Sequence, residues 1–218
     1  MSLKLQAYTT IKQKILSCEY PPNALLNEEK LCEDIQVSRT PIRDALSRLE
    51  QESLIQILPK RGIIVAGISL EEVEHIYELR LLLEPYALEH YGKTIDPGVY
   101  EKLLDFFARS PKKISLAEIH KKDDEFHHLF ISAAKNAYLT QAYQYPYTQN
   151  IRLRILSGNL GRPRIKISQG EHCEITKYCL DKSWKKGAEA LREHLLRSKD
   201  ISYNIITELQ LLLNPRSL

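Results

Sequence analysis

The spacing of apolar residues changes near residue 69, and this change most constrains how the 218-residue chain can fold. From there to about residue 213, apolar side chains recur at the three- and four-residue intervals of one helix face. Ser69, Ser115 and Ser168 each stand three residues before a glutamate at the start of such a stretch, the pattern of a helix capping box. The sequence therefore predicts an all-helical domain over residues 68–218. Its expected helices, about six, cover roughly residues 69–91, 97–108, 115–134, 137–157, 168–181 and 183–213.

The first part of the chain, residues 1–67, predicts three short helices followed by two strands. Residues 6–17 and 28–35 have helical spacing, "CEYPPNALL" between them is expected to form a turn, and a third helix begins after Ser38. The apolar stripe of this third helix consists of Ile42, Ala45, Leu46 and Leu49. "LIQIL" and "IIVAG" flank "PKRG", which predicts a hairpin with a basic tip. The expected fold class is therefore mainly α, with a winged helix-turn-helix before the helical bundle.

Composition excludes several classes of protein. Hydrophobic residues make up 43% of the chain and charged residues 27%, which is ordinary for a globular protein. No apolar run approaches the ~20 residues that a membrane-spanning helix needs, and the N-terminus lacks the apolar core of a signal peptide. The four cysteines form no CxxC pair, so neither a disulfide scaffold nor a zinc ribbon is expected. We therefore expect a cytoplasmic protein without a membrane partner.

Polar residues at the start of the third helix lie off its apolar stripe, namely Arg39, Thr40 and Arg43. In a helix-turn-helix, such residues meet base edges in the major groove, where arginine pairs with guanine. At the wing tip, Lys60 and Arg61 can reach the flanking backbone or minor groove, and Gly62 permits close approach. The alternative is a solvated helix face and an ordinary hairpin, and a net charge of +3 does not decide between them.

Four residues of the second domain have the types and spacing of a metal site. Asp123 and His127 lie four residues apart in "HKKDDEFHHLF", hence on one helix face, and His172 and His194 stand on two other expected helices. One carboxylate and three imidazoles form a reasonable shell for a divalent ion with open positions. Zinc, nickel, iron and manganese all accept these ligands. The alternative is that the histidines are ordinary core or surface residues.

Arg80 is the candidate effector-binding residue. It shares a partly apolar helix face with Val73 and Ala87, and a buried guanidinium is destabilising unless it is paired. Two interpretations remain open. Either Arg80 pairs with Glu84 one helical turn along, or it helps to hold an organic acid whose carboxylate completes the metal shell. In the fourth helix of this domain, Pro146 is expected to kink or break the helix because it removes a backbone donor.

The segment "YPPNALLNEEKLCEDIQVSRTPIRDALSRLEQESLIQILPKRGIIV", and above all "SRTPIRDAL", resembles the winged-helix domain of the GntR family of bacterial transcription regulators. The resemblance covers about residues 5–66. It implies that DNA is contacted by Arg39, Thr40, Arg43, Arg61 and Gly62, with a phosphate contact from Arg48.

The chain departs from this family pattern at a few positions. Where such sequences usually carry glycine, it has Asn23, Gln36 and Ser53. Gln36 in the turn between two helices is expected to lower stability, because a side chain disfavours the left-handed conformation. Glu29 stands where some members place a DNA-contacting arginine. The operator sequence therefore stays open, whereas the mode of binding does not.

The second domain resembles the FCD effector domain of the FadR branch of this family. The matching elements are "YELRLLLEPYAL", "DDEFH", the "EH" at residues 171–172 and a late histidine before leucines. In metal-containing members, one aspartate and three histidines bind the ion. These ligands map onto Asp123, His127, His172 and His194, and six helices fit the shorter, VanR-like subgroup.

The residues and both resemblances together predict a ligand-responsive transcriptional regulator, with repression expected. Two copies would form a homodimer on a pseudo-palindromic double-stranded DNA operator, and a small organic acid in the bundle would change DNA binding. One alternative is a DNA-binding dimer whose bundle is purely structural. A metal-dependent enzyme is disfavoured, because no nucleophile or general-base motif accompanies the metal ligands.

Overall fold

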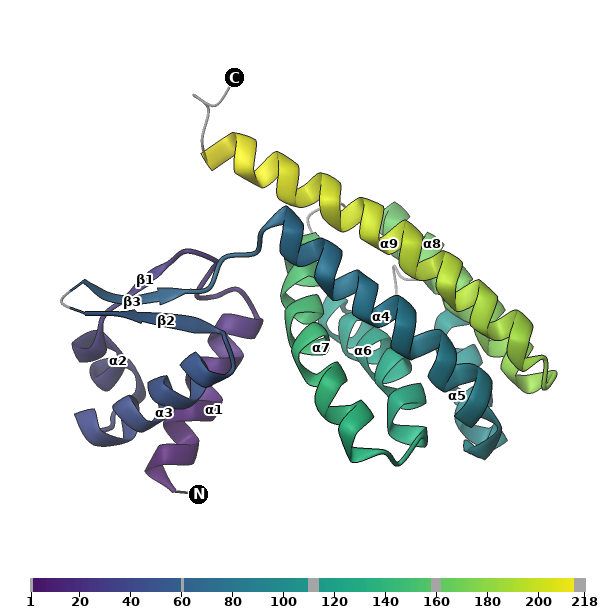
Figure 1. The fold of residues 1–218 in the computed structure, drawn as a ribbon, viewed down its shortest axis with the longest axis horizontal. Helices are drawn as coiled ribbons and strands as arrows, with labels where there is room; N and C mark the ends of the chain where they lie inside the picture. Colours follow the sequence, from purple (N-terminus) through teal and green to yellow (C-terminus); the bar gives the residue numbers. More distant parts are fainter. Residues whose placement is uncertain (1, 60, 110–113, 158–161, 214–218) are drawn as a thin grey trace. The chain divides into compact units, whose positions relative to one another are not determined.

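The structure is a computed structural model of the chain, and it describes residues 2–59, 61–109, 114–157 and 162–213. The chain divides into two compact units, Met1–Ser69 and Leu70–Leu218, and each has its own hydrophobic core (Figure 1). None of the described helices is long and apolar enough to cross a membrane. The mainly helical fold class is confirmed, with a winged helix-turn-helix followed by a helical bundle.

In its described residues, the first unit contains three helices and a small antiparallel sheet. In chain order its elements are α1 (Leu3–Leu16), β1 (Leu25–Leu26), α2 (Glu28–Ile35), α3 (Arg39–Gln51), β2 (Ile55–Leu58) and β3 (Gly62–Val65). The expected hairpin is present, and β2 pairs with β3 from Ile55 opposite Val65 to Leu58 opposite Gly62. The sheet has a third strand, because β1 pairs with the other edge of β3. Sequence analysis assigned β1 to a turn, since two residues are too few to show strand alternation.

The core of the first unit determines which face of α3 remains exposed. The predicted stripe of α3 is buried and consists of Ile42, Ala45, Leu46 and Leu49. It packs with buried residues of α1, including Ile11 and Ile15. Because this face of the helix is used for packing, Arg39, Thr40 and Arg43 remain on its exposed side.

Four of the described non-glycine residues of the first unit, Cys18 and three others, adopt the left-handed backbone conformation. Asn23, Gln36 and Ser53 have φ angles of 66°, 59° and 56°, at the positions where sequence analysis expected glycine. Gln36 ends α2, and its side-chain amide donates a hydrogen bond to the Glu33 carbonyl at 2.7 Å. The turn between α2 and α3 therefore has its expected geometry despite an unfavourable residue.

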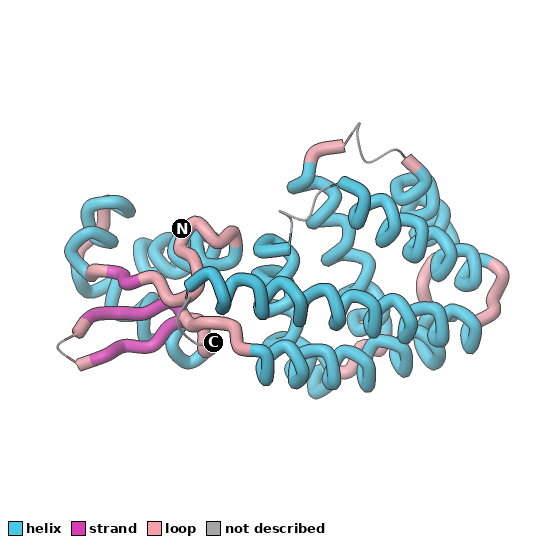
Figure 2. Tube along the Cα trace, turned by 90° about the horizontal axis from the view of Figure 1, so that it is seen from above, coloured by secondary structure: helices cyan, strands magenta, loops and turns pink. Residues whose placement is uncertain are grey.

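The described part of the second unit contains six α-helices and one short 3₁₀ turn. These are α4 (Leu70–Tyr91), η1 (Gly92–Thr94), α5 (Pro97–Ala108), α6 (Leu116–Ala133), α7 (Ala137–Ser157), α8 (Arg162–Leu180) and α9 (Trp184–Leu213). The long helices α4 and α9 run side by side, and α5 packs against α8 (Figures 1 and 2). The Ser115 hydroxyl accepts a hydrogen bond from the Glu118 amide at 3.2 Å, so this predicted cap is confirmed.

One local prediction for the bundle was wrong, and a second was wrong in one of its two alternatives. Helix α8 begins at Arg162, so Ser168 lies inside it and does not cap its N-terminus. The polar start of α8 concealed the boundary, and Pro163 falls in the first turn, where proline needs no hydrogen-bonded amide. Pro146 was expected to kink or break the fourth helix, and of these two outcomes the break does not occur, because α7 continues from Ala137 to Ser157 around it.

The left-handed residue at the end of α2 makes a stability prediction. Replacing Gln36 with glycine should raise the free energy of unfolding by up to about 1 kcal/mol, because glycine adopts positive φ without steric strain. The matched control is Gln13→Gly, an exposed site within right-handed α1, which should instead lose about 0.5–1 kcal/mol. Urea unfolding of both variants measures the difference, and a less stable Gln36→Gly variant would contradict the strain argument.

Candidate metal centre and nucleic-acid interface

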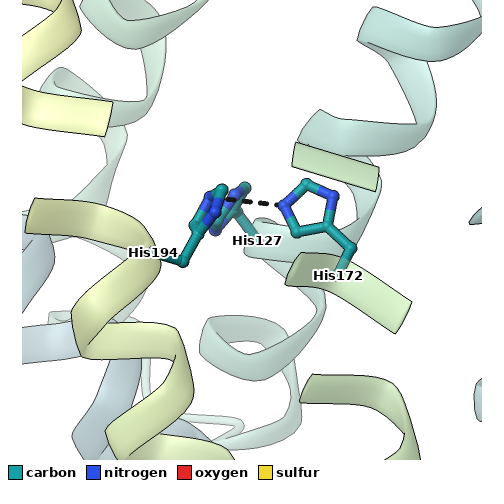
Figure 3. A group of neighbouring side chains, drawn as sticks. All are labelled: His127, His172 and His194. Carbon is teal, nitrogen blue, oxygen red and sulfur yellow. Dashed lines mark hydrogen bonds between the residues drawn. The ribbon is translucent and has the colours of Figure 1, made fainter. Parts of the chain in front are cut away.

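Three histidines from three helices converge inside the second unit. His127 lies on α6, His172 on α8 and His194 on α9, and all three are buried. One ring nitrogen from each lies within 4.8 Å of the other two. Figure 3 shows the three rings facing one another, with 3.3 Å between Nε2 of His172 and Nε2 of His194. Three imidazoles in this arrangement form a donor set suited to a divalent transition metal.

Two carboxylates orient the rings, one buried (Glu84) and one partly buried (Glu171). Glu84 Oε2 lies 2.6 Å from Nδ1 of His127, and Glu171 Oε2 lies 2.7 Å from Nδ1 of His194. A carboxylate at Nδ1 favours the tautomer that carries the proton there, so the Nε2 lone pair is left for a metal ion. Sequence analysis did not assign this role to Glu84 or Glu171. Their partners lie 43 and 23 residues away, beyond any helical spacing.

The electrostatic environment keeps two of the histidines in their metal-binding form. Burial, followed by the neighbouring His194, lowers the pKa of His172 well below its ordinary value. Burial likewise lowers the pKa of His194. Because metal ions bind neutral imidazole, both rings are in the required protonation state near neutral pH.

Asp123 lies beside the three histidines and also forms an ion pair with Arg154. Its Oδ1 is 3.7 Å from Nε2 of His172, whereas its Oδ2 accepts a hydrogen bond from Arg154 Nη1 at 2.7 Å. Burial opposes ionisation of Asp123, but Arg154 and the three histidines together outweigh it and hold the pKa of this carboxyl well below its usual range. The structure thus places all four predicted ligands in one region, with the three histidines as the tightest group.

Arg80 is almost completely buried next to this group and forms the ion pair considered in the sequence analysis. Its Nε bonds Glu84 Oε1 at 2.6 Å, and its Nη1 bonds Asn150 Oδ1 at 2.6 Å. Glu84 also accepts a hydrogen bond from the Tyr143 hydroxyl at 2.6 Å. Burial disfavours the charge on Glu84, but Arg80 and His127 together outweigh it and lower the pKa of this carboxyl to about 2. Pairing with Glu84 does not use all donors of Arg80, because Nη2 is buried with no hydrogen-bond partner in the described structure.

A cavity of about 110 Å³ opens onto the histidines. Among its polar wall residues are Tyr77, Arg80, Asp123, Asn150, Arg154 and Gln169. The side-chain amide of Gln169 is buried, and neither its nitrogen nor its oxygen has a hydrogen-bond partner within the described residues. Unpaired buried polar groups are destabilising unless water or a ligand satisfies them. The cavity thus presents a cation and an amide to a small polar molecule beside the histidines.

The predicted DNA-contacting residues of α3 are exposed. The side chains of Arg39 and Arg43 are 63% and 69% accessible, and Thr40 is exposed between them. Both arginines also form ion pairs that the sequence analysis did not anticipate. Arg39 Nη2 lies 2.7 Å from Glu29 Oε1, and Arg43 Nε lies 2.8 Å from Glu28 Oε1. Each pair connects α3 to the first turn of α2.

The wing and Arg48 complete the set of predicted DNA contacts. Arg61 is exposed, and Gly62 has a φ of 105°, so the turn itself requires glycine there. Lys60 lies outside the described residues. The Arg48 guanidinium stacks 3.7 Å from the Tyr8 ring centroid and lies 3.4 Å from Glu52 Oε1. Arg48 therefore stabilises the α1–α3 contact, whatever it contributes to DNA binding.

Comparisons with known proteins agree with this architecture. Residues 3–65 match the family described as bacterial regulatory proteins, gntR family, and residues 75–197 match the FCD domain. The second match alone spans more than half of the chain.

Three individual proteins illustrate the similarity. An uncharacterised HTH-type transcriptional regulator of Streptomyces ambofaciens is 30% identical over 191 residues, or 86% of this chain and 80% of that protein. The gluconate operon transcriptional repressor of Bacillus licheniformis is 30% identical over 132 residues, or 59% of this chain and 54% of that protein. The solved structure of E. coli McbR/YncC has a TM-score of 0.79 at 18% identity and covers 94% of this chain and 98% of its own. The chain therefore belongs to the GntR family, as a DNA-binding transcriptional regulator with an FCD domain, and not to a family of enzymes.

Proposed function

We propose that this regulator binds a small carboxylate metabolite at a metal site in its FCD domain and thereby changes its affinity for DNA. The observation that carries the proposal is the unpaired Nη2 of buried Arg80 in the cavity beside three converging histidines. A buried guanidinium donor without an acceptor favours an anion that enters the cavity. A cavity of about 110 Å³ limits that anion to a small molecule.

The metal would be held by Nε2 of His127, His172 and His194, with Asp123 as the fourth protein ligand. A bound divalent ion supplies positive charge and open coordination positions for a carboxylate. Zinc, nickel, iron and manganese remain candidates because all accept imidazole and carboxylate. Glu84 and Glu171 would hold the His127 and His194 rings in place, and Arg154 would hold Asp123.

The effector response would pass through α4, which carries both Arg80 and Glu84. Helix α4 begins at Leu70, directly after the DNA-binding unit in the sequence. An effector that binds Arg80 contacts this helix directly. Such an effector changes the affinity for DNA if it binds the DNA-competent and DNA-incompetent states of the protein with different affinities.

On the DNA side, Arg39, Thr40 and Arg43 would face base edges in the major groove, and the wing residues Lys60, Arg61 and Gly62 would contact the flanking duplex. Arg48 would reach a phosphate with its exposed part. Two copies would bind a pseudo-palindromic operator as a homodimer. Repression is supported by similarity to the gluconate operon repressor, whose name states that activity.

The metal assignment predicts that His172→Ala abolishes stoichiometric metal binding. Metal-free protein would be incubated with zinc, desalted and assayed for bound metal by mass spectrometry. The control is His75→Ala, because His75 is an exposed residue of α4. We expect the wild type and His75→Ala to retain the ion, and circular dichroism should show unchanged helix content in both variants. Stoichiometric zinc in His172→Ala would exclude His172 as a ligand.

The DNA assignment predicts that Arg43→Ala weakens operator binding by about 1–3 kcal/mol, the range for a good base contact. The operator would first be selected with wild-type protein from a random-sequence duplex pool. Fluorescence anisotropy at fixed salt then gives the dissociation constants. Arg109→Ala removes an exposed arginine of the second unit and should leave affinity unchanged. Equal affinities for Arg43→Ala and the wild type would refute the docking mode.

The effector assignment predicts that Arg80→Lys impairs the ligand response. Lysine keeps the charge but cannot bond Glu84, Asn150 and a ligand carboxylate with one planar group. Zinc-loaded protein would be screened by thermal shift with acetate, lactate, succinate, malate and gluconate. We expect at least one acid to stabilise the wild type and to bind Arg80→Lys at least about tenfold more weakly, a loss of about 1.4 kcal/mol. Stabilisation by no acid, or equal binding to both proteins, would contradict the proposal.

A further inference from the structure

Two exposed arginines near the start of α3, Arg39 and Arg43, are already held by carboxylates of their own domain. Arg39 bonds Glu29 and Arg43 bonds Glu28, at 2.7 and 2.8 Å. The two glutamates are the first two residues of α2. Both pairs are at least partly exposed, so a DNA group that approaches either arginine meets the glutamate as a competitor.

The local sequence fixes these carboxylates in place. Asn27 caps α2, and its side-chain oxygen accepts a hydrogen bond from the Glu29 amide at 2.7 Å. Glu28 and Glu29 therefore occupy the first turn of α2, where the helix dipole favours negative charge. The same position would otherwise favour a DNA phosphate. In this chain it carries two carboxylates instead.

The two ion pairs differ in which nitrogen they use. Glu28 bonds the inner Nε of Arg43, so this bond does not use the outer Nη1 and Nη2 atoms. A guanidinium held through Nε can still present its outer edge to a guanine. Glu29 bonds Nη2 of Arg39, one of the outer nitrogens itself. An acceptor on DNA must therefore displace Glu29 to use that nitrogen.

We propose that Glu28 and Glu29 are specificity-determining residues for DNA binding. Glu28 positions Arg43 for a base edge, and Glu29 competes with any DNA acceptor, base edge or phosphate, for Arg39. Non-specific DNA affinity comes almost entirely from phosphate contacts. Two carboxylates that repel phosphates and compete for the arginines therefore weaken non-specific binding more than operator binding. The operator adds bidentate contacts from the arginines to base edges, and these contacts compensate for the loss of the two ion pairs. The inference rests on the proposed DNA contacts of Arg39 and Arg43.

The test compares Glu28→Gln and Glu29→Gln with Glu33→Gln, in which the same charge is removed from an exposed position on α2. Each variant is titrated by fluorescence anisotropy with a random-sequence duplex pool and with the operator duplex selected by wild-type protein, over a series of salt concentrations. An exposed ion pair changes an equilibrium by up to about fivefold. We therefore expect Glu28→Gln and Glu29→Gln each to bind the random pool about three- to fivefold more tightly.

The preference for operator over random DNA should fall by a similar factor in both variants, and the salt dependence on random DNA should become steeper. Glu33→Gln should change this preference less than about twofold, because salt screens the effect on DNA of a charge that does not contact Arg39 or Arg43 directly. The inference fails if Glu28→Gln and Glu29→Gln do not differ from Glu33→Gln.

Arg39→Gln and Arg43→Gln separate this inference from the DNA assignment beneath it. Weaker operator binding by the arginine variants, together with an unchanged preference in the glutamate variants, would overturn the inference alone. Normal operator binding by the arginine variants would overturn both.

Discussion

The arrangement of the FCD domain depends on one buried carboxylate, Glu84. It has no exposed surface, yet it is charged and bonds Arg80, His127 and Tyr143. A buried charge is tolerated only when its hydrogen-bonding capacity is satisfied, so α4, α6 and α7 must meet around it. One carboxylate oxygen of Glu84, Oε2, orients a histidine of the candidate metal centre, and the other, Oε1, orients the arginine of the candidate anion site. The proposed metal site and the proposed anion site are therefore both held in place by Glu84.

The DNA-binding domain distributes its charges differently. Its arginines lie on the outer side of α3 because Ile42, Leu46 and their neighbours take the inner side for the core. Here the partners of the arginines are exposed glutamates, which water and ions screen. An exposed pair can exchange for DNA at small free-energy cost, whereas the buried Arg80–Glu84 pair is fixed. One chain thus uses arginine–glutamate pairs for both exchangeable and permanent contacts.

The sequence predicted most helices of this fold, because long periodic stretches with capping residues identify helices well. Features without such a pattern were missed, including the two-residue strand β1 and the polar start of α8. In the site, the spacing of Asp123 and His127 placed both on one face, and Arg80 was correctly considered as a partner of Glu84. Helical spacing does not reach between helices, so the contacts of Glu84 with His127 and of Glu171 with His194 emerged only from the fold.

In the turn of the wing, one residue determines the backbone conformation and its neighbour carries the charged side chain. Gly62 adopts a positive φ where the hairpin turn enters β3, and a Cβ atom there would approach the Leu26 carbonyl at 3.4 Å. Neighbouring Arg61 is exposed and outside the hydrophobic core. The backbone of the wing therefore depends on the glycine and not on Arg61, so the proposed contact of Arg61 with DNA can be varied by substitution while the hairpin keeps its course.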